Sequence, residues 1–380
     1  MPGSEFKLIS ADSHVNPRTE MWAEYLAPEF RDRAPRVESD ETADYEVFEG
    51  RRKPIANLAS AAGRRPEEYS AAIRRFDEVR PGGWDPAARL EDQDIDGVEA
   101  EVLFGAVGNA PLASEDPRLA RASFTAYNHW LADFCSHDPN RLIGLAGIPC
   151  DSPDDAIDEV RDAASRGLRG AVIAHNPGVG EWHDDQWEPF WRAVLDEGWP
   201  AHLHVSSGVR RSQGSVAAPN AVNPDGTPRG DLFMNSLVAS KLESALSLGS
   251  FVLGGVLARY PDLKIVSVEA QIGWVPFWKY YIDHVYEKHR WWTKFSLDEV
   301  PSYYADRQVF FTFMEDPPGI ELAHRCNVNR IMWSSDYPHS ETTYPHSRKI
   351  AEDILSHLPA EHFKRVVRDN CAELYGLSAG

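Results

Sequence analysis

Short apolar runs, each closed by a turn or a polar residue, recur along most of the chain. Several of these runs are continuous and β-branched rather than alternating, which is typical of parallel strands that are buried on both faces. The pattern predicts eight strands, at Phe6–Asp12, Glu99–Phe104, Leu142–Pro149, Ala171–His175, Pro200–Val205, Lys264–Glu269, Val309–Met314 and Ile331–Asp336.

Helix-like stretches separate these runs. Ser152–Arg166 begins with Ser-Pro, carries acids in its first turn and is followed by Gly167, which together indicate a helix with defined ends. The other predicted helices are Asp116–Ser136, Trp187–Glu197, Asp231–Leu248, Gly273–His289 and Pro345–Leu358. Strands and helices that alternate in this way predict an α/β fold, a (β/α)8 TIM barrel, with a doubly wound open sheet as the alternative.

Two stretches do not fit the barrel repeat. We expect one domain over residues 1–380, with long loop insertions at about 15–86 and 206–230. Because each follows a strand that carries candidate ligands, both are expected at the carboxy-terminal face of the barrel, as a lid or a substrate wall. The alternative is that they are peripheral insertions that only pack against the barrel.

The chain is acidic, with a net charge of −20. Nucleic acids and anionic membranes require basic patches, so we expect neither as a partner. The sequence has no signal-peptide pattern and no apolar run near the roughly 20 residues of a membrane span, and we therefore expect a cytoplasmic protein. Cys135, Cys150, Cys326 and Cys371 lack a metal-like spacing and are predicted to be buried thiols.

Histidines and acids stand at the ends of several predicted strands. Asp12 and His14 lie two residues apart, so on a strand their side chains point the same way. His202 and His204 share one face of an apolar strand, where buried imidazoles need partners. We expect His204 to bind a metal, and His202 to lie one layer deeper as a supporting or core residue.

Other strand ends add to this set. Glu269, His175 and Asp336 each close a strand, and His339 follows three residues after Asp336. A carboxylate at the end of a buried strand is costly unless it meets a cation or a hydrogen-bond donor. The combination of imidazole and carboxylate without thiolate favours one divalent ion, with zinc expected first and manganese or iron(II) as alternatives.

The same motifs resemble those of a known family. The chain is similar to the second amidohydrolase-related family of metal-dependent hydrolases and decarboxylases, which includes aminocarboxymuconate-semialdehyde decarboxylase and γ-resorcylate decarboxylase. The resemblance rests on Ile9-Ser10-Ala11-Asp12-Ser13-His14-Val15, Leu203-His204-Val205, Val268-Glu269-Ala270-Gln271-Ile272-Gly273-Trp274, Ser335-Asp336-Tyr337-Pro338-His339 and Asn370-Cys371-Ala372-Glu373-Leu374-Tyr375-Gly376-Leu377.

The resemblance implies a barrel with one divalent metal and a homodimer or higher homo-oligomer. The family's ligand roles fall on Asp12, His14, His204 and Asp336. Glu269 departs from the family, because many members have a histidine at the end of the sixth strand.

Three functions are open at this point. The first is a hydrolase that acts on a small aromatic or cyclic substrate through a metal-bound water, with Asp336, Glu269 and His339 as catalytic residues. The second is a non-oxidative decarboxylase of an aromatic or unsaturated carboxylic acid. The third is a non-catalytic barrel that binds a ligand. For a small-molecule substrate, the candidate binding residues are His175, Arg210, Arg211 and Trp292.

Overall fold

The computed structural model describes residues 6–41, 43–54, 60–69, 75–105, 110–205, 207 and 229–377. Each of the eight predicted strand segments forms a strand in it, and their middle residues are buried. The third prediction, Leu142–Pro149, is divided by Leu145 into two short pieces. The strands are β1 (Leu8–His14), β5 (Val98–Phe104), β6 (Leu142–Gly144), β7 (Ala146–Gly147), β8 (Ala171–Ile173), β9 (Ala201–His204), β10 (Ile265–Val268), β11 (Val309–Phe313) and β12 (Ile331–Trp333).

These strands close into a barrel. Neighbours pair in parallel in the order β1-β5-β6 and β7-β8-β9-β10-β11-β12. The first and last strands meet where the amide of Asp336 donates to the carbonyl of Asp12 at 3.0 Å and the amide of His14 donates to the carbonyl of Tyr337. An open sheet has two free edges, so this contact confirms the (β/α)8 barrel and rules out the doubly wound alternative.

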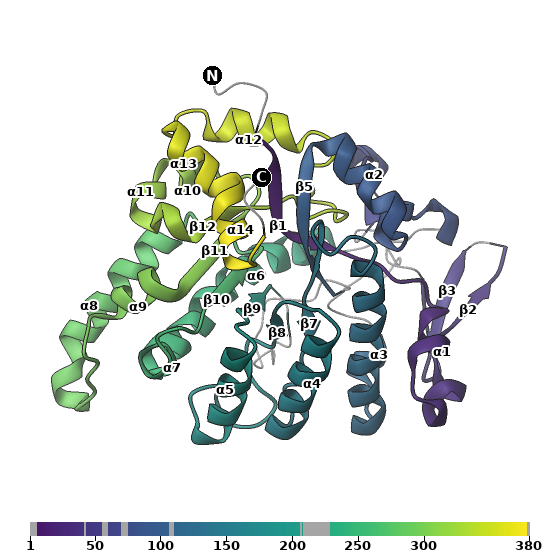
Figure 1. The fold of residues 1–380 in the computed structure, drawn as a ribbon, viewed down its shortest axis with the longest axis horizontal. Helices are drawn as coiled ribbons and strands as arrows, with labels where there is room; N and C mark the ends of the chain where they lie inside the picture. Colours follow the sequence, from purple (N-terminus) through teal and green to yellow (C-terminus); the bar gives the residue numbers. More distant parts are fainter. Residues whose placement is uncertain are drawn as a thin grey trace.

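The helices form the outer layer of the barrel (Figure 1). The predicted helix after β7 is confirmed, and the Ser152 hydroxyl caps it by accepting from the amide of Asp155. The helix predicted at Pro345–Leu358 is shorter, at Ser347–Leu355. The helices are α1 (Met21–Tyr25), α2 (Pro86–Asp96), α3 (Pro117–Cys135), α4 (Pro153–Ser165), α5 (Glu188–Asp196), α6 (Gly230–Leu253), α7 (Val256–Arg259), α8 (Val275–Thr293), α9 (Pro301–Gln308), α10 (Pro317–Glu321), α11 (Ala323–Cys326), α12 (Ser347–Leu355), α13 (Ala360–Lys364) and α14 (Asn370–Leu374).

The core has two parts. One cluster joins the outer faces of the strands to the helices and contains Trp187, Trp191 and Trp333. The other takes side chains from strands around the barrel, together with Cys371–Tyr375, and fills the barrel interior. The four cysteines are buried, as predicted.

A β-bulge changes the direction of the side chains at the end of β1. Ile9 and Ala11 belong to the interior cluster, so simple alternation would place Asp12 on the outer face. Between Ser10 and Ser13, however, β1 uses one residue more than β5 does, and the register shifts. An extra residue of this kind re-aims the following side chains, and here it lets Asp12 and His14 join the interior histidines.

The first insertion has structure of its own. It contains a small antiparallel sheet of β2 (Arg36–Ser39), β3 (Asp44–Phe48) and β4 (Arg51–Pro54), which lies beside the barrel (Figure 1). Trp22 from this insertion is buried in the main core, so part of the segment packs against the barrel wall. Most of the second insertion, 206–230, lies outside the described residues, and its role as a lid stays a prediction.

Candidate metal centre

Five side chains from four strand ends converge inside the mouth of the barrel. The two ring nitrogens His14 Nε2 and His204 Nε2 face each other at 3.2 Å. Asp12 Oδ1 lies 3.5 Å from His14 Nε2 and 3.6 Å from His204 Nε2. On the other side of His14, Asp336 Oδ1 lies 3.3 Å from the same nitrogen, and Glu269 Oε2 lies 3.3 Å from His204 Nε2.

This arrangement fits one divalent metal ion. Bonds of 2.0–2.1 Å at a tetrahedral angle would place two ligand atoms about 3.3 Å apart, close to the separations observed here. All four carboxylate oxygens of Asp12 and Asp336 are buried and accept no hydrogen bond from the residues that the structure describes. Buried carboxylates without donors are costly, and a cation held between them and the two histidines would remove that cost.

Charge within the cluster is unevenly distributed. Burial, assisted by the nearby His339, lowers the pKa of His14 to about 4. For His204 burial also acts to lower the pKa, but the carboxylates of Asp12 and Glu269 outweigh it and raise the pKa to about 9. Burial acts to raise the pKa of Asp336, but His339 and His14 hold it well below its usual range. The carboxylates around His204 therefore favour positive charge at this position.

His339 lies at the edge of the cluster. Its Nδ1 is 3.0 Å from Asp336 Oδ1, and its ring stacks on that of His14 with 3.9 Å between the centroids. Together with His14, Glu269 and Asp336 it forms a second group whose ligand atoms lie within 4.8 Å of one another. His339 is therefore placed either to orient Asp336 or to exchange a proton with it.

Glu269 is connected to a lysine that the sequence reasoning missed. Lys241 on α6 donates to Glu269 Oε1 at 2.7 Å and to Glu341 Oε2 at 2.8 Å. Burial and the neighbouring Asp336 raise the pKa of Glu269 to about 6, and Lys241 partly offsets them. The sequence did contain a signal for this contact. Lys241 stands among serines and apolar residues in the predicted helix Asp231–Leu248, and a charge in such surroundings needs a partner of opposite charge.

The backbone at the two carboxylates is also unusual. Glu269 has φ of 59° and Asp336 has φ of 53°, in the left-handed region that side chains other than glycine seldom adopt. Residues held in this region cluster at functional sites, where the surrounding structure fixes them. Glu269 is held in part because its amide donates to Thr312 Oγ1 at 2.9 Å.

A buried polar network supports the end of β1 from below. Arg89 on α2 is fully buried and forms an ion pair with Glu101 on β5, with 2.5 Å between Nε and Oε2. Arg89 also donates to the carbonyl of His14 at 2.8 Å, while the Ser13 hydroxyl donates to Glu101 at 3.0 Å. Gln93 adds a further donor to Glu101. The network therefore fixes the backbone on which Asp12 and His14 stand.

Two of the other predicted histidines lie next to the cluster but do not point into it. His175 is buried between the Ser247 hydroxyl and the carbonyl of His204, to which its Nε2 donates at 2.9 Å. It holds the backbone of a predicted ligand, and substrate contact by this side chain stays a prediction. His202 bonds to Tyr375 Oη and the carbonyl of Ala171 in the barrel interior, as expected for a deeper supporting residue.

Trp292 is not at the cluster. It is 74% exposed in the last turn of α8, and its indole donates to His289. Helix α8 begins at Val275, just after β10, and a helix rises about 1.5 Å per residue. Trp292 therefore lies roughly 25 Å along the helix axis from Val275. Substrate contact by Trp292 stays a prediction. Arg210 and Arg211 lie outside the described residues.

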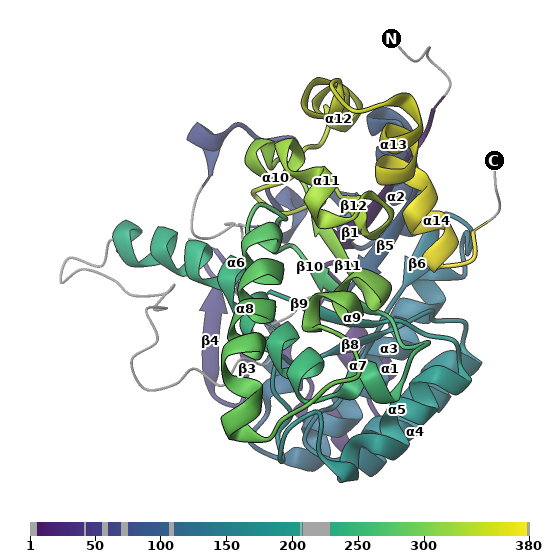
Figure 2. The same ribbon diagram turned by 90° about the vertical axis from the view of Figure 1, so that its left-hand side faces the viewer.

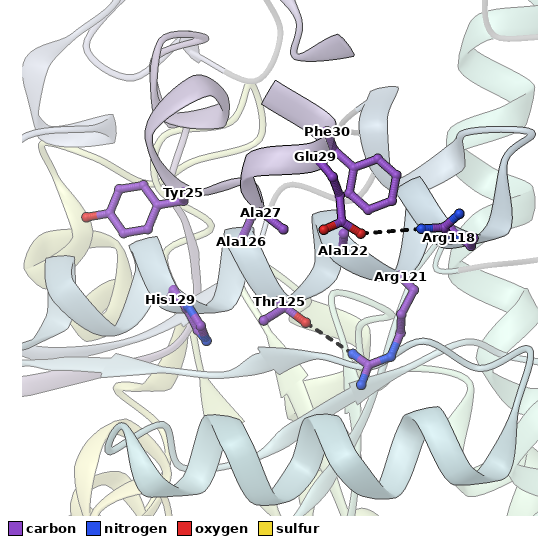
Figure 3. Close-up of a pocket in the computed structure, with 10 residues that line it drawn as sticks. All are labelled: Tyr25, Ala27, Glu29, Phe30, Arg118, Arg121, Ala122, Thr125, Ala126 and His129. Carbon is purple, nitrogen blue, oxygen red and sulfur yellow. Dashed lines mark hydrogen bonds and ion pairs between the residues drawn. The ribbon is translucent and has the colours of Figure 1, made fainter. Parts of the chain in front are cut away.

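A separate cavity of about 510 Å³ opens on the outside of the barrel, between α3 and the segment that follows α1. Tyr25, Phe30, Arg118, Arg121 and His129 are among its lining residues, as Figure 3 shows. Both arginines that line it already have acidic partners. Arg118 donates a hydrogen bond to Glu29, and Arg121 forms an ion pair with the buried Glu159. This cavity is therefore distinct from the metal cluster, and its cations are already neutralised.

Comparisons with known proteins agree with the fold. Residues 11–377 match the family model described as amidohydrolase. A γ-resorcylate decarboxylase from Rhodococcus jostii is 26% identical over 314 residues, which cover 76% of this chain and 87% of that protein.

Solved structures give the same result for the fold. An amidohydrolase from Mycobacterium avium subsp. paratuberculosis has a TM-score of 0.77 at 20% identity, covering 98% of this chain and 100% of that one. A 5-carboxyvanillate decarboxylase from Novosphingobium aromaticivorans, complexed with manganese and 4-hydroxy-3-methoxy-5-nitrobenzoic acid, has a TM-score of 0.68 at 18% identity, covering 99% of this chain and 98% of that one.

Proposed function

We propose that this chain, which belongs to the amidohydrolase family, is a metal-dependent decarboxylase of a small aromatic or unsaturated carboxylic acid. The observation that carries the proposal is a pair of overlapping clusters with metal-ligand spacing, Asp12, His14, His204 and Glu269, and His14, Glu269, Asp336 and His339. The similarity to γ-resorcylate decarboxylase favours loss of CO2 over the hydrolysis that we first expected.

In this proposal the cluster holds one divalent ion, zinc or manganese, through Asp12, His14, His204 and Asp336. Such an ion, when bound, would supply positive charge to orient an acidic substrate and to stabilise the negative charge that develops as CO2 leaves. Lys241 and the network around Arg89 keep the surrounding carboxylates and the end of β1 in place before substrate arrives.

The reaction has a defined balance of atoms and charge. The bond between the substrate carbon and its carboxylate breaks, CO2 departs, and the electron pair stays on the carbon, which then takes a proton. A protonated group must stand close to that carbon. Asp336, Glu269 and His339 surround the site, and we assign the proton delivery to one of these three side chains.

Hydrolysis is the second candidate, and Glu269 is the observation that favours it. A glutamate carboxylate can act as a general base and accept a proton from water. Glu269 Oε2 lies 3.3 Å from His204 Nε2, so it is near enough to the cluster for this role.

The test is product analysis with the purified protein after loading with zinc or manganese. Dihydroxybenzoic acids and hydroxy-methoxybenzoic acids are supplied as decarboxylation substrates, and lactones and amides as hydrolysis substrates. We expect the wild-type protein to release CO2 in an amount equal to the decarboxylated product, and we expect His204→Ala to release none. Turnover of lactones or amides without CO2 would establish the hydrolase instead.

A further inference from the structure

Helix α2 buries a polar face against the barrel. Its almost completely buried residues are all polar or charged: Arg89, Asp92, Gln93 and Asp96. They follow the spacing i, i+3, i+4 and i+7, which an ordinary surface helix fills with apolar residues. In Figure 1 and in Figure 2, α2 lies beside β5, the strand that pairs with β1. Because buried polar groups need hydrogen-bond partners, this face indicates specific polar contacts near the strand ends.

Asp92 receives hydrogen bonds from three side chains. Tyr337 Oη donates to its Oδ2 at 2.5 Å, and Tyr344 Oη donates to its Oδ1 at 3.2 Å. Arg80 donates to both carboxylate oxygens, from Nε at 2.8 Å and from Nη2 at 2.5 Å. Asp92 is buried, so its charge depends on these donors in place of water.

The two tyrosines stand on either side of a loop that follows β12. The rings of Tyr337 and Tyr344 pack edge to face with 5.2 Å between their centroids, and both hydroxyls point to Asp92. Asp336 comes directly before the first tyrosine, and His339 lies between the two. One carboxylate on α2 therefore holds both ends of the segment that carries two of the candidate acid–base groups.

The backbone at Asp336 requires support of this kind. Its φ of 53° is costly for a residue other than glycine and persists only where the surrounding structure fixes it. The next residue, Tyr337, is fixed at three points. Its carbonyl accepts from the amide of His14, and its hydroxyl donates to Asp92. Its ring lies against the guanidinium of Arg89, with 4.1 Å to the centroid. These contacts hold the peptide that directs the Asp336 carboxylate into the cluster.

A glycine packs against the same hydrogen bond. A Cβ atom at Gly82 would meet both Asp92 Oδ2 and Tyr337 Oη well inside van der Waals contact. The carbonyl of Gly82 also accepts from Arg89 at 3.1 Å. The segment around Gly82 therefore confines the bond between Asp92 and Tyr337, so that neither group can move without displacing it.

We propose that Asp92 is a positioning residue, which holds Tyr337 and Tyr344 and thereby fixes the loop that presents Asp336 and His339 to the proposed metal site. Asp92 belongs to neither group of possible metal ligands, so it acts through the tyrosines. The inference rests on the proposed function and deepens it, because it names a residue of another element on which the acid–base groups depend.

The first experiment measures the Mn²⁺ dissociation constant of the metal-free full chain by calorimetry. Tyr337→Phe deletes one hydroxyl and leaves Asp92 with Arg80 and Tyr344 as partners, while Asp92→Asn keeps the shape and removes the charge. Both are expected to raise the dissociation constant at least about tenfold, the low end of the effect of losing a residue that supports metal ligands. Thermal unfolding by circular dichroism checks that both variants are folded.

Asp96→Asn is the matched control. Asp96 is as buried as Asp92, with 5% and 6% exposure, and lies one turn farther along α2. Its carboxylate accepts from the amide and hydroxyl of Ser347, beyond the loop, so the control is expected to keep the wild-type dissociation constant. A lower melting temperature with unchanged Mn²⁺ affinity in Asp92→Asn and Tyr337→Phe would make Asp92 a packing residue and overturn the proposal. An equal loss of affinity in Asp96→Asn would overturn it as well.

A second experiment reports on the ligand geometry without any substrate. The visible absorption of bound Co²⁺ depends on the number and arrangement of its ligands. The spectrum is expected to change in Tyr337→Phe and to stay as in wild type in Asp96→Asn. Identical spectra in wild type, Tyr337→Phe and Asp92→Asn would contradict the positioning role.

Turnover separates this inference from the proposed function. On an aromatic acid from which wild type releases CO2, Asp92→Asn saturated with Mn²⁺ is expected to lose about tenfold in kcat with KM changed less than about twofold. Weaker metal binding in Asp92→Asn, without CO2 release by wild type from any acid, would support the positioning role and refute the decarboxylase. CO2 release by wild type, with unchanged affinity and kcat in Asp92→Asn, would do the reverse. Wild type that binds neither Mn²⁺ nor Co²⁺ would overturn both.

Discussion

Replacement of Arg89 by methionine tests the buried network that supports the proposed metal ligands at the end of β1. The change keeps most of the side-chain volume but removes the guanidinium that pairs with Glu101 and bonds the carbonyl of His14. Both members of the ion pair are almost completely buried. The Glu101 carboxylate would keep Ser13 and Gln93 as donors but would lose its countercharge.

The expected loss can be worked from these contacts. Removing one partner of a buried ion pair costs about 3–5 kcal/mol, because the other charge stays buried without compensation. An unfolding entropy of about 2.1 cal/mol/K per residue gives roughly 0.8 kcal/mol/K for a chain of this length. The melting temperature of Arg89→Met should therefore fall by about 4–6 °C. Its metal content should also fall, because His14 loses a backbone support.

The assay is thermal unfolding by circular dichroism at fixed protein and metal concentration, with metal content measured on the same samples. Arg36→Met is the matched control, since Arg36 forms an exposed pair with Glu38 and should change the melting temperature by less than about 1 °C. The double variant Arg89→Met/Glu101→Met should recover part of the loss, because it leaves no unpaired charge. A melting temperature unchanged in Arg89→Met, or a double variant less stable than the single, would refute the reasoning.

Four further predictions concern the site and its surroundings. His204→Ala should lose most of the bound metal while the barrel stays folded, and full metal occupancy by elemental analysis would show that the ligand set is misplaced. Asp336→Asn should lower the turnover number by at least about 100-fold, which is the typical effect of losing general acid–base catalysis. The turnover number should fall by a larger factor than the metal content. An unchanged turnover number would contradict an acid–base role for Asp336. Glu269→Gln should fold normally and lose at least about tenfold in turnover, or roughly 1.4 kcal/mol of barrier, whereas the exposed control Glu315→Gln should keep wild-type turnover. Burial raises the pKa of Asp96 to about 6 in the folded chain. The protonated Asp96 side chain therefore stabilises the folded state fully below the unfolded pKa of about 3.9, and this stabilisation is lost as the pH rises through 6. The melting temperature measured against pH should show this loss in wild type and not in Asp96→Asn.

The barrel and the metal cluster could be predicted because their signals are local. Continuous apolar runs identify buried parallel strands, and a histidine or acid at the end of such a run has few structural explanations. That reasoning placed candidate ligands at the strand ends, and the family resemblance then selected Asp12, His14, His204 and Asp336 among them. Glu269 and His339 were found in the same way.

The remaining features depend on contacts between distant segments. The bulge in β1 is a property of two paired strands, so the sequence of one strand cannot show it. Lys241 contacts Glu269 from helix α6, and the partner of this lysine depends on the length and direction of the helix. Trp292 was chosen for its composition, but the 19 residues of α8 carry it away from the cluster. The small sheet of the first insertion was missed because its edge strands β2 and β4 are charged rather than apolar.

The closure of the barrel between β1 and β12 has a consequence for biosynthesis. The contact between Ser10 and Ser335 joins residues 325 apart in the chain, and the proposed metal ligands Asp12 and Asp336 stand beside it. At about 5–20 residues per second, a ribosome needs roughly 15 to 65 s to make the intervening segment. During that interval Asp12 and His14 have no Asp336 to complete the cluster. With the proposed ligand set, the complete site forms only after nearly the whole chain has emerged. We therefore expect metal loading to follow translation, and a truncated chain that ends before β12 should emerge without the site.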